Sequence, residues 1–282
     1  MKQPSILGVD LGATNIRAAQ VSRASISTIH SKKINSSGSE QQVLEDVFEV
    51  IDLTLDKEVE GIGIGVPGVV DVKTGTVYDV QYIPSWKEVP LRKHLEERYR
   101  LPVFVNNDAN CFALGEHYFG KGRGIESMIG LAIGTGMGAG IIIHNKLYAG
   151  PNCGAGEFGM VEYLDKVYEY YCAGQFFQNV YNLDGQEVFR HAQHGDASAL
   201  KLYREMGTHL GNAIKMIMYT YDPELIIIGG SLRFAYSFYE VTMWERIKTF
   251  AYPKSTARLK IELSELENSA ILGAAALYFD NL

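Results

Sequence analysis

Short apolar runs of β-type residues alternate along the chain with longer runs of helical periodicity. The strand-like runs cover residues 6–9, 16–21, 61–66, 103–106, 128–133, 139–144 and 225–228. Between them, apolar side chains recur every three or four residues over 43–51 and 200–221, as on the buried face of an amphipathic helix. This alternation predicts an α/β fold, and 282 residues that are 46% hydrophobic suffice for one large or two medium cores.

Charge and cysteine content argue against several classes of protein. The formal net charge is −7 and no basic run is long, which argues against a nucleic-acid surface. Three cysteines without C-x-x-C spacing fit neither a disulfide framework nor a four-cysteine zinc site, and they favour a reducing cytoplasm. We expect no signal peptide and no membrane span, because the longest uncharged stretch, 127–143, is short and rich in glycine.

The segment GVDLGATNIR, residues 8–17, places an aspartate at the end of an apolar run and a narrow turn directly after it. Gly12, Ala13 and Thr14 would let backbone N–H groups and a hydroxyl point at an anion, while Asp10 holds a hydrated cation nearby. Taken alone, the segment is more often an ordinary tight turn. It therefore raises the hypothesis of a phosphate site without deciding it.

A second glycine-rich segment, IGTGMGAGII at 133–142, has strand-like runs on both sides. Gly134, Gly136 and Gly138 permit close backbone approach and Thr135 adds a hydroxyl, which suits a second phosphate contact. A strand rather than a helix follows, so the segment is not a dinucleotide fingerprint. A glycine-rich hairpin packed beneath a neighbouring element is an equally good interpretation. Two such segments in one chain favour a nucleoside triphosphate.

The segment VNNDANCFALGE, residues 105–116, marks the end of a strand and the beginning of a helix. Asp108 is either the N-cap of that helix or a carboxylate at the strand end, with Asn107 beside it to bind a hydroxyl. An aspartate base suits phosphoryl transfer to an alcohol, because it need only orient the hydroxyl and take its proton late.

Carboxylates and a rigid bend supply weaker signals. Pro67 and Gly68 fix a bend after a strand, for which a structural turn is nearly sufficient explanation. Glu157 in GAGEFG and Glu169 in YEYYCAG either bind sugar hydroxyls through charge-assisted hydrogen bonds or are simply solvated.

Near the C-terminus, PELIIIGGS reads as a buried strand that ends in Gly229 and Gly230, where an adenine or ribose could approach. The helix expected over 270–279 carries small residues on one face. That face would pack either against the Gly229–Gly230 loop or within an ordinary core.

Taken in order, DLGATNIR, IGVPGVVD, NNDAN, IGTGMGAGI, GAGEFG, IIIGGS and ILGAA resemble the full motif series of the ROK family. That family comprises sugar kinases and related repressors on the actin-like ATPase (ribonuclease H-like) fold. The resemblance runs from residue 6 to about residue 277. It implies two α/β lobes with a central cleft: a small lobe of residues 1–115, joined by the returning C-terminal helix 268–282, and a large lobe of residues 116–267.

The resemblance also implies an ATP-dependent hexose kinase and the roles of its residues. Asp108 would be the catalytic base, and Asp10 would sit near the magnesium of MgATP, through water. The implied ATP and phosphate contacts are Asp10, Gly12, Thr14, Asn15, Gly134, Thr135, Gly136, Gly138, Gly229 and Gly230. The implied sugar contacts are Pro67, Gly68, Asn107, Asp108, Glu157 and Glu169. The acceptor would be a hexose hydroxyl, most often the 6-hydroxyl, with glucose and N-acetylmannosamine as first candidates, and the enzyme would be a cytoplasmic homodimer without nucleic-acid or membrane partners.

One departure from the family pattern affects the region between the two glutamates. Met160 replaces the usual histidine, and the cysteines of the family zinc loop do not follow, so we expect no zinc. Tyr163, Tyr168, Tyr170 and Tyr171 would instead pack this shorter loop in place of the metal.

Two other functions remain open. A sugar-sensing repressor of the same family would carry an added N-terminal helix-turn-helix domain, whereas here the first phosphate loop begins at residue 10. A sugar-binding protein without turnover would fit the missing zinc loop, but the presence of Asp10 and Asp108 argues against it.

Overall fold

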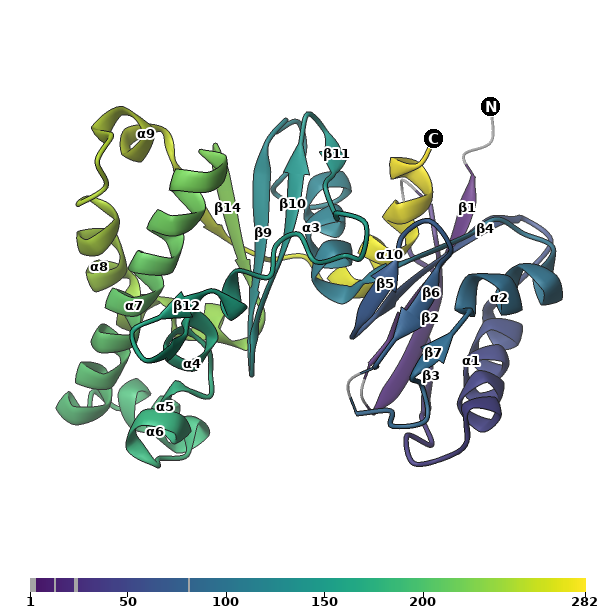
Figure 1. The fold of residues 1–282 in the computed structure, drawn as a ribbon, viewed down its shortest axis with the longest axis horizontal. Helices are drawn as coiled ribbons and strands as arrows, with labels where there is room; N and C mark the ends of the chain where they lie inside the picture. The colour runs from purple at the N-terminus through teal and green to yellow at the C-terminus, as the bar shows by residue number, and fades with distance from the viewer. Residues whose placement is uncertain (1–3, 13, 23–24, 81) are drawn as a thin grey trace. The chain divides into compact units, whose positions relative to one another are not determined.

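The computed structural model describes residues 4–12, 14–22, 25–80 and 82–282, so Ala13 of the first glycine turn lies outside the described residues (Figure 1). The chain divides into two compact units. The first comprises residues 1–126, 140–155 and 265–282, and the second comprises residues 127–139 and 156–264. The lobe boundaries expected from the sequence, and the cleft between the lobes, stay predictions.

The first unit is built on a five-stranded sheet with the order β3-β2-β1-β4-β8. β1 pairs antiparallel with β2 and parallel with β4, and β4 pairs parallel with β8. Its elements are β1 (Ser5–Leu11), β2 (Asn15–Val21), β3 (His30–Lys33), α1 (Glu40–Thr54), β4 (Val59–Val66), a small sheet of β5 (Val69–Asp71), β6 (Thr76–Tyr78) and β7 (Glu88–Val89), α2 (Leu91–Tyr99), β8 (Val103–Asn107), α3 (Asp108–Tyr118), β11 (Lys146–Leu147) and α10 (Ser269–Asp280).

Helices cover both faces of this sheet. Alternate residues of β1 point to opposite sides, so Leu7 and Val9 join the core under α1 while Ile6 joins a second cluster with Ile271 of α10. α10 approaches the strands very closely: a Cβ atom at Gly63 of β4 would lie 1.8 Å from the carbonyl oxygen of Ala274. The small residues of α10 therefore serve core packing, which was one of the two readings open from the sequence.

The second unit surrounds a sheet in which β14 lies between β9 and β15 and is parallel to both. The strand order of this sheet is β11-β10-β9-β14-β15. The elements are β9 (Met128–Ile133), the first three residues of β10 (Met137–Ile143, of which residues 140–143 belong to the first unit), the hairpin β12 (Glu162–Tyr163) and β13 (Lys166–Val167), α4 (Tyr168–Cys172), α5 (Phe176–Tyr181), α6 (Gly185–Gln193), α7 (Ala197–Tyr221), β14 (Leu225–Gly229), α8 (Tyr236–Ile247), α9 (Pro253–Arg258), β15 (Lys260–Leu263) and two 3₁₀ turns, Phe158–Met160 and Ser231–Ala235.

The long helix α7 packs along α8 in this unit (Figure 1). Asp196 caps the beginning of α7, since its side chain accepts a hydrogen bond from the Ala199 N–H at 2.8 Å. The helix ends at Tyr221, just before the Asp222-Pro223 pair. The expected α/β alternation and each of the strands and helices predicted from periodicity are confirmed, with ends that differ by a few residues.

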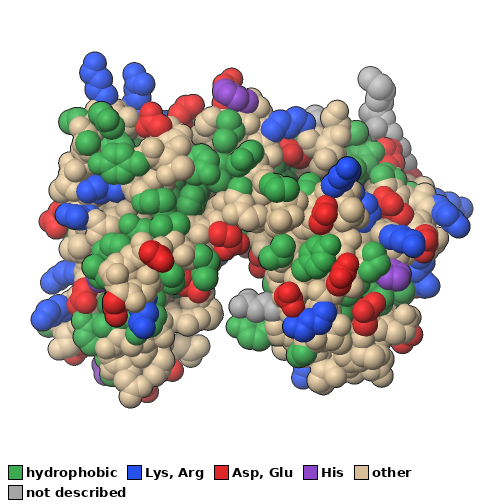
Figure 2. Space-filling view, viewed as in Figure 1, with side chains coloured by type: hydrophobic (Ala, Val, Ile, Leu, Met, Phe, Trp, Pro, Cys, Tyr) green, Lys and Arg blue, Asp and Glu red, His purple; other side chains and the backbone are tan. Residues whose placement is uncertain are grey.

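The surface carries both signs of charge. On the face drawn in Figure 2, Lys and Arg side chains are interspersed with Asp and Glu rather than gathered in one patch. Among the described residues, no helix is both long enough and apolar enough to span a membrane.

Candidate active site

Three parallel strands of the first unit end at the same edge of their sheet. The register pairs Asp10 of β1 with Gly65 of β4, and Val66 of β4 with Asn107 of β8. The carboxyl ends of neighbouring parallel strands are the usual place for a ligand site in an α/β sheet. Asp10, the Pro67–Gly68 bend and the Asn107–Asp108 pair are therefore brought together by the sheet itself.

Asp10 is paired with an arginine that the sequence analysis missed. Arg17 stands directly opposite Asp10 in the β1–β2 hairpin. Its Nη2 and Nε atoms donate to Asp10 Oδ2 at 2.6 and 3.1 Å. In the turn between the strands, the Gly12 N–H donates to the Asn15 carbonyl at 2.9 Å. The carboxylate is thus fixed beside the turn that was predicted to bind phosphate.

At the start of α3, the Ala109 N–H donates both to Asn107 Oδ1 and to Asp108 Oδ1, each at 2.8 Å. The Asn107 side chain caps the helix, because its Oδ1 accepts from the Ala109 N–H at 2.8 Å. Asn107 Nδ2 donates to the Gly68 carbonyl at 3.2 Å, which joins two of the predicted sugar contacts. Asp108 is the first residue of the helix and is exposed, so its carboxylate is accessible from solvent.

Behind this edge lies a buried polar network that the sequence did not reveal. Asn106 Oδ1 accepts from the Asn107 N–H at 2.9 Å, from Asn110 Nδ2 at 2.9 Å and from Cys153 Sγ at 3.0 Å. Burial, followed by the charges of Asp108 and Asp10, raises the pKa of the Cys111 thiol well above its usual value. The network fixes the strand end that carries Asn107 and Asp108.

In the second unit, the glycine ends of two adjacent strands meet. Gly229 of β14 pairs with Ala132 of β9. Gly230 has φ of 76°, and a Cβ atom there would lie 2.2 Å from the Ile133 carbonyl oxygen, so only glycine fits. Gly134, Thr135 and Gly136 form the short turn after β9, whereas Gly138 lies inside β10.

Glu157 and Glu169 also belong to the second unit and lie within electrostatic reach of each other. Partial desolvation raises the pKa of Glu157, and the charge of Glu169 raises it further. Glu169, on α4, accepts a hydrogen bond at Oε2 from the Met137 N–H at 2.8 Å. The structure therefore brings Glu169 to the second glycine turn, a contact that sequence reasoning did not anticipate.

A cavity of about 800 Å³ opens beside this turn. Gly134, Thr135 and Ser231 lie at its polar side, and Phe177 and Phe234 are among its apolar walls. Its size falls in the range of small-molecule and cofactor sites. Gln178, Asp184 and Gln186 add polar groups to the same cavity, and nothing in the sequence pattern had singled them out.

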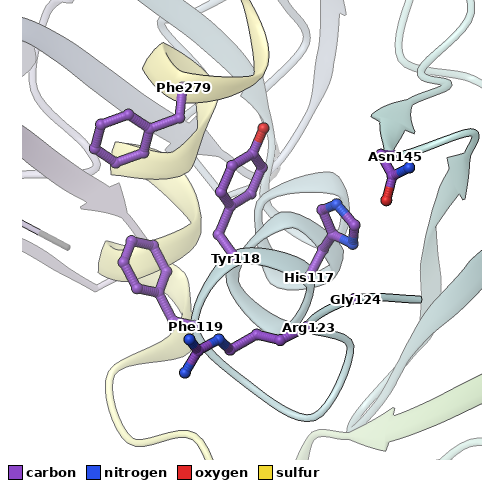
Figure 3. A pocket seen from close by; sticks show the side chains of 7 residues that line it. All are labelled: His117, Tyr118, Phe119, Arg123, Gly124, Asn145 and Phe279. Atoms are coloured by element: carbon purple, nitrogen blue, oxygen red, sulfur yellow. The ribbon is translucent and has the colours of Figure 1, made fainter. Parts of the chain in front are cut away.

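A smaller cavity of about 370 Å³ lies in the first unit, away from every residue predicted for the site. Figure 3 shows His117 and Tyr118 of α3, Phe119 after it and Phe279 of α10 around this space. Within the described ranges, no group of three or more His, Cys, Asp or Glu side chains is arranged to hold a metal ion.

Comparison with known protein families matches residues 6–281 to the ROK family. The glucokinase of Thermotoga maritima is 27% identical to this chain, over 98% of each. The xylose repressor of Caldicellulosiruptor bescii is 28% identical, over 99% of this chain and 79% of its own.

Among solved structures, a ROK family glucokinase from Streptomyces griseus in complex with glucose and AMPPNP superposes with a TM-score of 0.78. It is 26% identical, and the alignment covers 97% of this chain and 98% of that one. The expected actin-like ATPase fold is thereby confirmed.

Proposed function

The chain belongs to the ROK family, and from this premise we propose that it transfers the γ-phosphoryl group of MgATP to a hydroxyl of a hexose. It is a sugar kinase, that is, a phosphotransferase with an alcohol acceptor. Two of the similar proteins are named glucokinases. The observation that carries the proposal is the position of Asp108, exposed at the end of β8 beside Asn107 and on the same sheet edge as Asp10.

Asp108 acts in this proposal as the general base. Its carboxylate orients the acceptor hydroxyl and takes the proton as the bond to phosphorus forms, which suits the loose transition state of phosphoryl transfer. Asn107 is held by its cap to Ala109 and by Gly68, so a hydroxyl that binds this segment meets groups already fixed in place. Pro67 and Gly68 contribute the bend, and Glu157 and Glu169 accept hydrogen bonds from other hydroxyls of the sugar.

The residues present fit a magnesium nucleotide. Magnesium commonly keeps several waters and binds through one or two carboxylates together with the substrate phosphates. Asp10, held at Oδ2 by Arg17, offers one such carboxylate next to the turn that contains Gly12, Thr14 and Asn15. Bound MgATP supplies the phosphoryl group and the cation charge that offsets its negative charge.

In this proposal, the nucleoside of ATP binds in the 800 Å³ cavity of the second unit. Gly134, Thr135, Gly136 and Gly138 would receive phosphates, and Gly229 with Gly230 would border the adenosine. Phe234 and Leu232 offer apolar surface for a base in that cavity. The absence of zinc stays a prediction, which rests on Met160 in place of the family histidine and on the missing cysteines of the zinc loop. No step of the reaction is assigned to zinc.

The acceptor is proposed to be the 6-hydroxyl of glucose or of an N-acetylhexosamine such as N-acetylmannosamine. The first experiment is sugar-dependent ADP release from MgATP across hexoses, N-acetylhexosamines and ribose. With the active sugar, Asp108→Asn should lower kcat by about 10²- to 10⁴-fold. Asp79→Asn is the matched control, because Asp79 is an exposed carboxylate in the same unit that pairs with Lys87.

The similarity to a xylose repressor makes a sugar-responsive regulator the second candidate. If no sugar of the panel stimulates ADP release while calorimetry still detects sugar binding, the kinase assignment is overturned in favour of such a sensor or a binding protein. Homodimer formation and a cytoplasmic location are proposed from family membership alone, and light scattering with size-exclusion chromatography tests the former.

A further inference from the structure

The carboxylate of Glu169 lies against the second glycine turn. Its Oε2 atom accepts a hydrogen bond from the Met137 N–H at 2.8 Å. Met137 is the first residue of β10 and directly follows Gly134, Thr135 and Gly136. Among the described residues, no hydrogen bond reaches the other oxygen, Oε1, from the protein. One oxygen thus holds the turn, and the second is available to a ligand.

Two glycine residues leave the space that the Glu169 side chain occupies. A Cβ atom at Gly136 would lie 2.6 Å from Glu169 Oε2, so a side chain at that position would displace the carboxylate. A Cβ atom at Gly159 would lie 3.3 Å from Glu169 Cβ and 2.5 Å from the Met137 carbonyl oxygen. Beyond the end of α4, the Gly174 N–H donates to the Gly134 carbonyl at 2.7 Å. Residues 169–174 therefore hold both ends of the turn.

We propose that Glu169 couples the two substrates: it binds the acceptor sugar through Oε1 and positions the donor-phosphate turn through Oε2. This inference rests on the proposed kinase function and deepens it. Without a sugar, a full negative charge lies against a turn that must receive phosphates, and this charge disfavours the nucleotide. Sugar hydroxyls that donate to Oε1 spread that charge, so sugar binding raises the affinity for the nucleotide.

The coupling is reciprocal, because a sugar that tightens nucleotide binding must itself bind more tightly when the nucleotide is present. A Glu169 that served only as a sugar ligand would have no such effect: its loss would weaken sugar binding and leave nucleotide binding unchanged. The two roles are therefore separable by binding measurements that require no turnover.

Glu169→Gln tests the proposal, because the amide oxygen can still accept the Met137 N–H while the charge is removed. The Kd of magnesium AMPPNP is measured by calorimetry with and without the sugar that supports turnover. In the unaltered enzyme, we expect saturating sugar to lower this Kd by about 5-fold or more. In Glu169→Gln, we expect a Kd about 5-fold lower than that of the unaltered enzyme without sugar, and no further change with sugar.

Glu157→Gln is the matched control. Glu157 is the neighbouring carboxylate, but within the described chain no hydrogen bond joins it to the glycine turn. This variant should weaken sugar binding yet keep the sugar-dependent change in nucleotide affinity at saturating sugar. Loss of the change in both variants would overturn the assignment to Glu169.

The outcomes separate the two proposals. An enzyme that turns over a sugar but binds AMPPNP equally well with and without it overturns the coupling and leaves the kinase function standing. Absence of ADP release with every sugar overturns the kinase function. Even then, the AMPPNP affinity of Glu169→Gln without sugar decides the coupling, since an unchanged Kd contradicts it.

Discussion

At the scale of single residues, Asp10 depends on Arg17 for its position. The two groups face each other across the β1–β2 hairpin with Nη2 and Oδ2 at 2.6 Å. Arg17→Met keeps the length of the side chain and removes the charge. Because an ion pair of this partly exposed kind is worth at most about 1 kcal/mol, we expect the KM for MgATP to rise about 2- to 5-fold. The KM for the sugar should change little.

Steady-state kinetics with each substrate varied in turn provide the measurement. Arg98→Met is the matched control, because Arg98 pairs with Asp52 at the same distance of 2.6 Å in the same unit, outside the predicted site. Equal increases in both KM values for Arg17→Met would show that Arg17 supports the fold in general rather than Asp10 in particular.

The sequence indicated which single residues belong to the candidate site better than it indicated which residues pair with them. Asp10 and Asp108 stand out in sequence because a carboxylate that ends an apolar strand needs a reason to be there. Arg17 does not, since its pairing with Asp10 follows only once the hairpin register places the two opposite each other. A search of the sequence for oppositely charged residues at equal separations on the two sides of the expected turn would have found this pair.

At the scale of elements, an aromatic cluster fixes the hairpin β12–β13 and α4. The Tyr163 ring stacks on Tyr168 with centroids 4.3 Å apart, and Asn212 Nδ2 donates to the Tyr163 hydroxyl at 2.8 Å. The same hydroxyl lies 3.1 Å from Nδ1 of His209 on α7. Tyr171 packs edge-on against Tyr163, and Tyr170 against Tyr171. The expected packing of the tyrosines is confirmed, whereas their replacement of zinc stays a prediction.

This cluster predicts a pH dependence of stability. Burial lowers the pKa of His209, although the charge of Glu205 opposes the shift. A histidine with a lowered folded pKa stabilises the protein above its unfolded value, about 6.5, and that contribution is lost as pH falls from there toward the folded pKa. We expect the Tm to drop between pH 7.5 and 5.5, and to drop less in His209→Gln.

Scanning calorimetry at the two pH values measures the difference. His194→Gln, at the exposed end of α6, is the control and should behave like the unaltered protein. Burial lowers the pKa of His117 too, but that contribution is common to all three proteins. The same pH-dependent drop in His209→Gln and in the unaltered chain would remove His209 as its source.

The surroundings of the second glycine-rich segment explain why its sequence fits both a phosphate-binding turn and a closely packed hairpin. In IGTGMGAGII, Gly136 makes room for Glu169, whereas a Cβ atom at Gly140 would lie 2.5 Å from Ala113 Cβ of α3. The same glycine run therefore serves the turn and the packing of a neighbouring helix. The apolar runs on either side predict two buried strands, and β9 and β10 are indeed buried along most of their length. Which neighbour each glycine meets depends on tertiary contacts that periodicity does not carry.

At the scale of the whole molecule, the reactivity of the three cysteine thiols can be used to follow the unfolding of both units. Cys111 and Cys153 belong to the first unit and Cys172 to the second, and all three are free and buried. Burial raises the pKa of each thiol. Because the thiolate is the reactive form, these groups should be inert in the folded chain at neutral pH.

We therefore expect all three thiols to react with DTNB in denaturant, and almost none to react in buffer on the time scale of free cysteine. Mass spectrometry after alkylation at increasing denaturant then assigns each modified thiol. Since burial protects each cysteine through its own unit, Cys172 should become reactive independently of the other two if the units open separately, and together with them if unfolding is two-state. Rapid labelling of any one thiol in buffer would contradict its burial and would locate the part of the chain that opens in the native state.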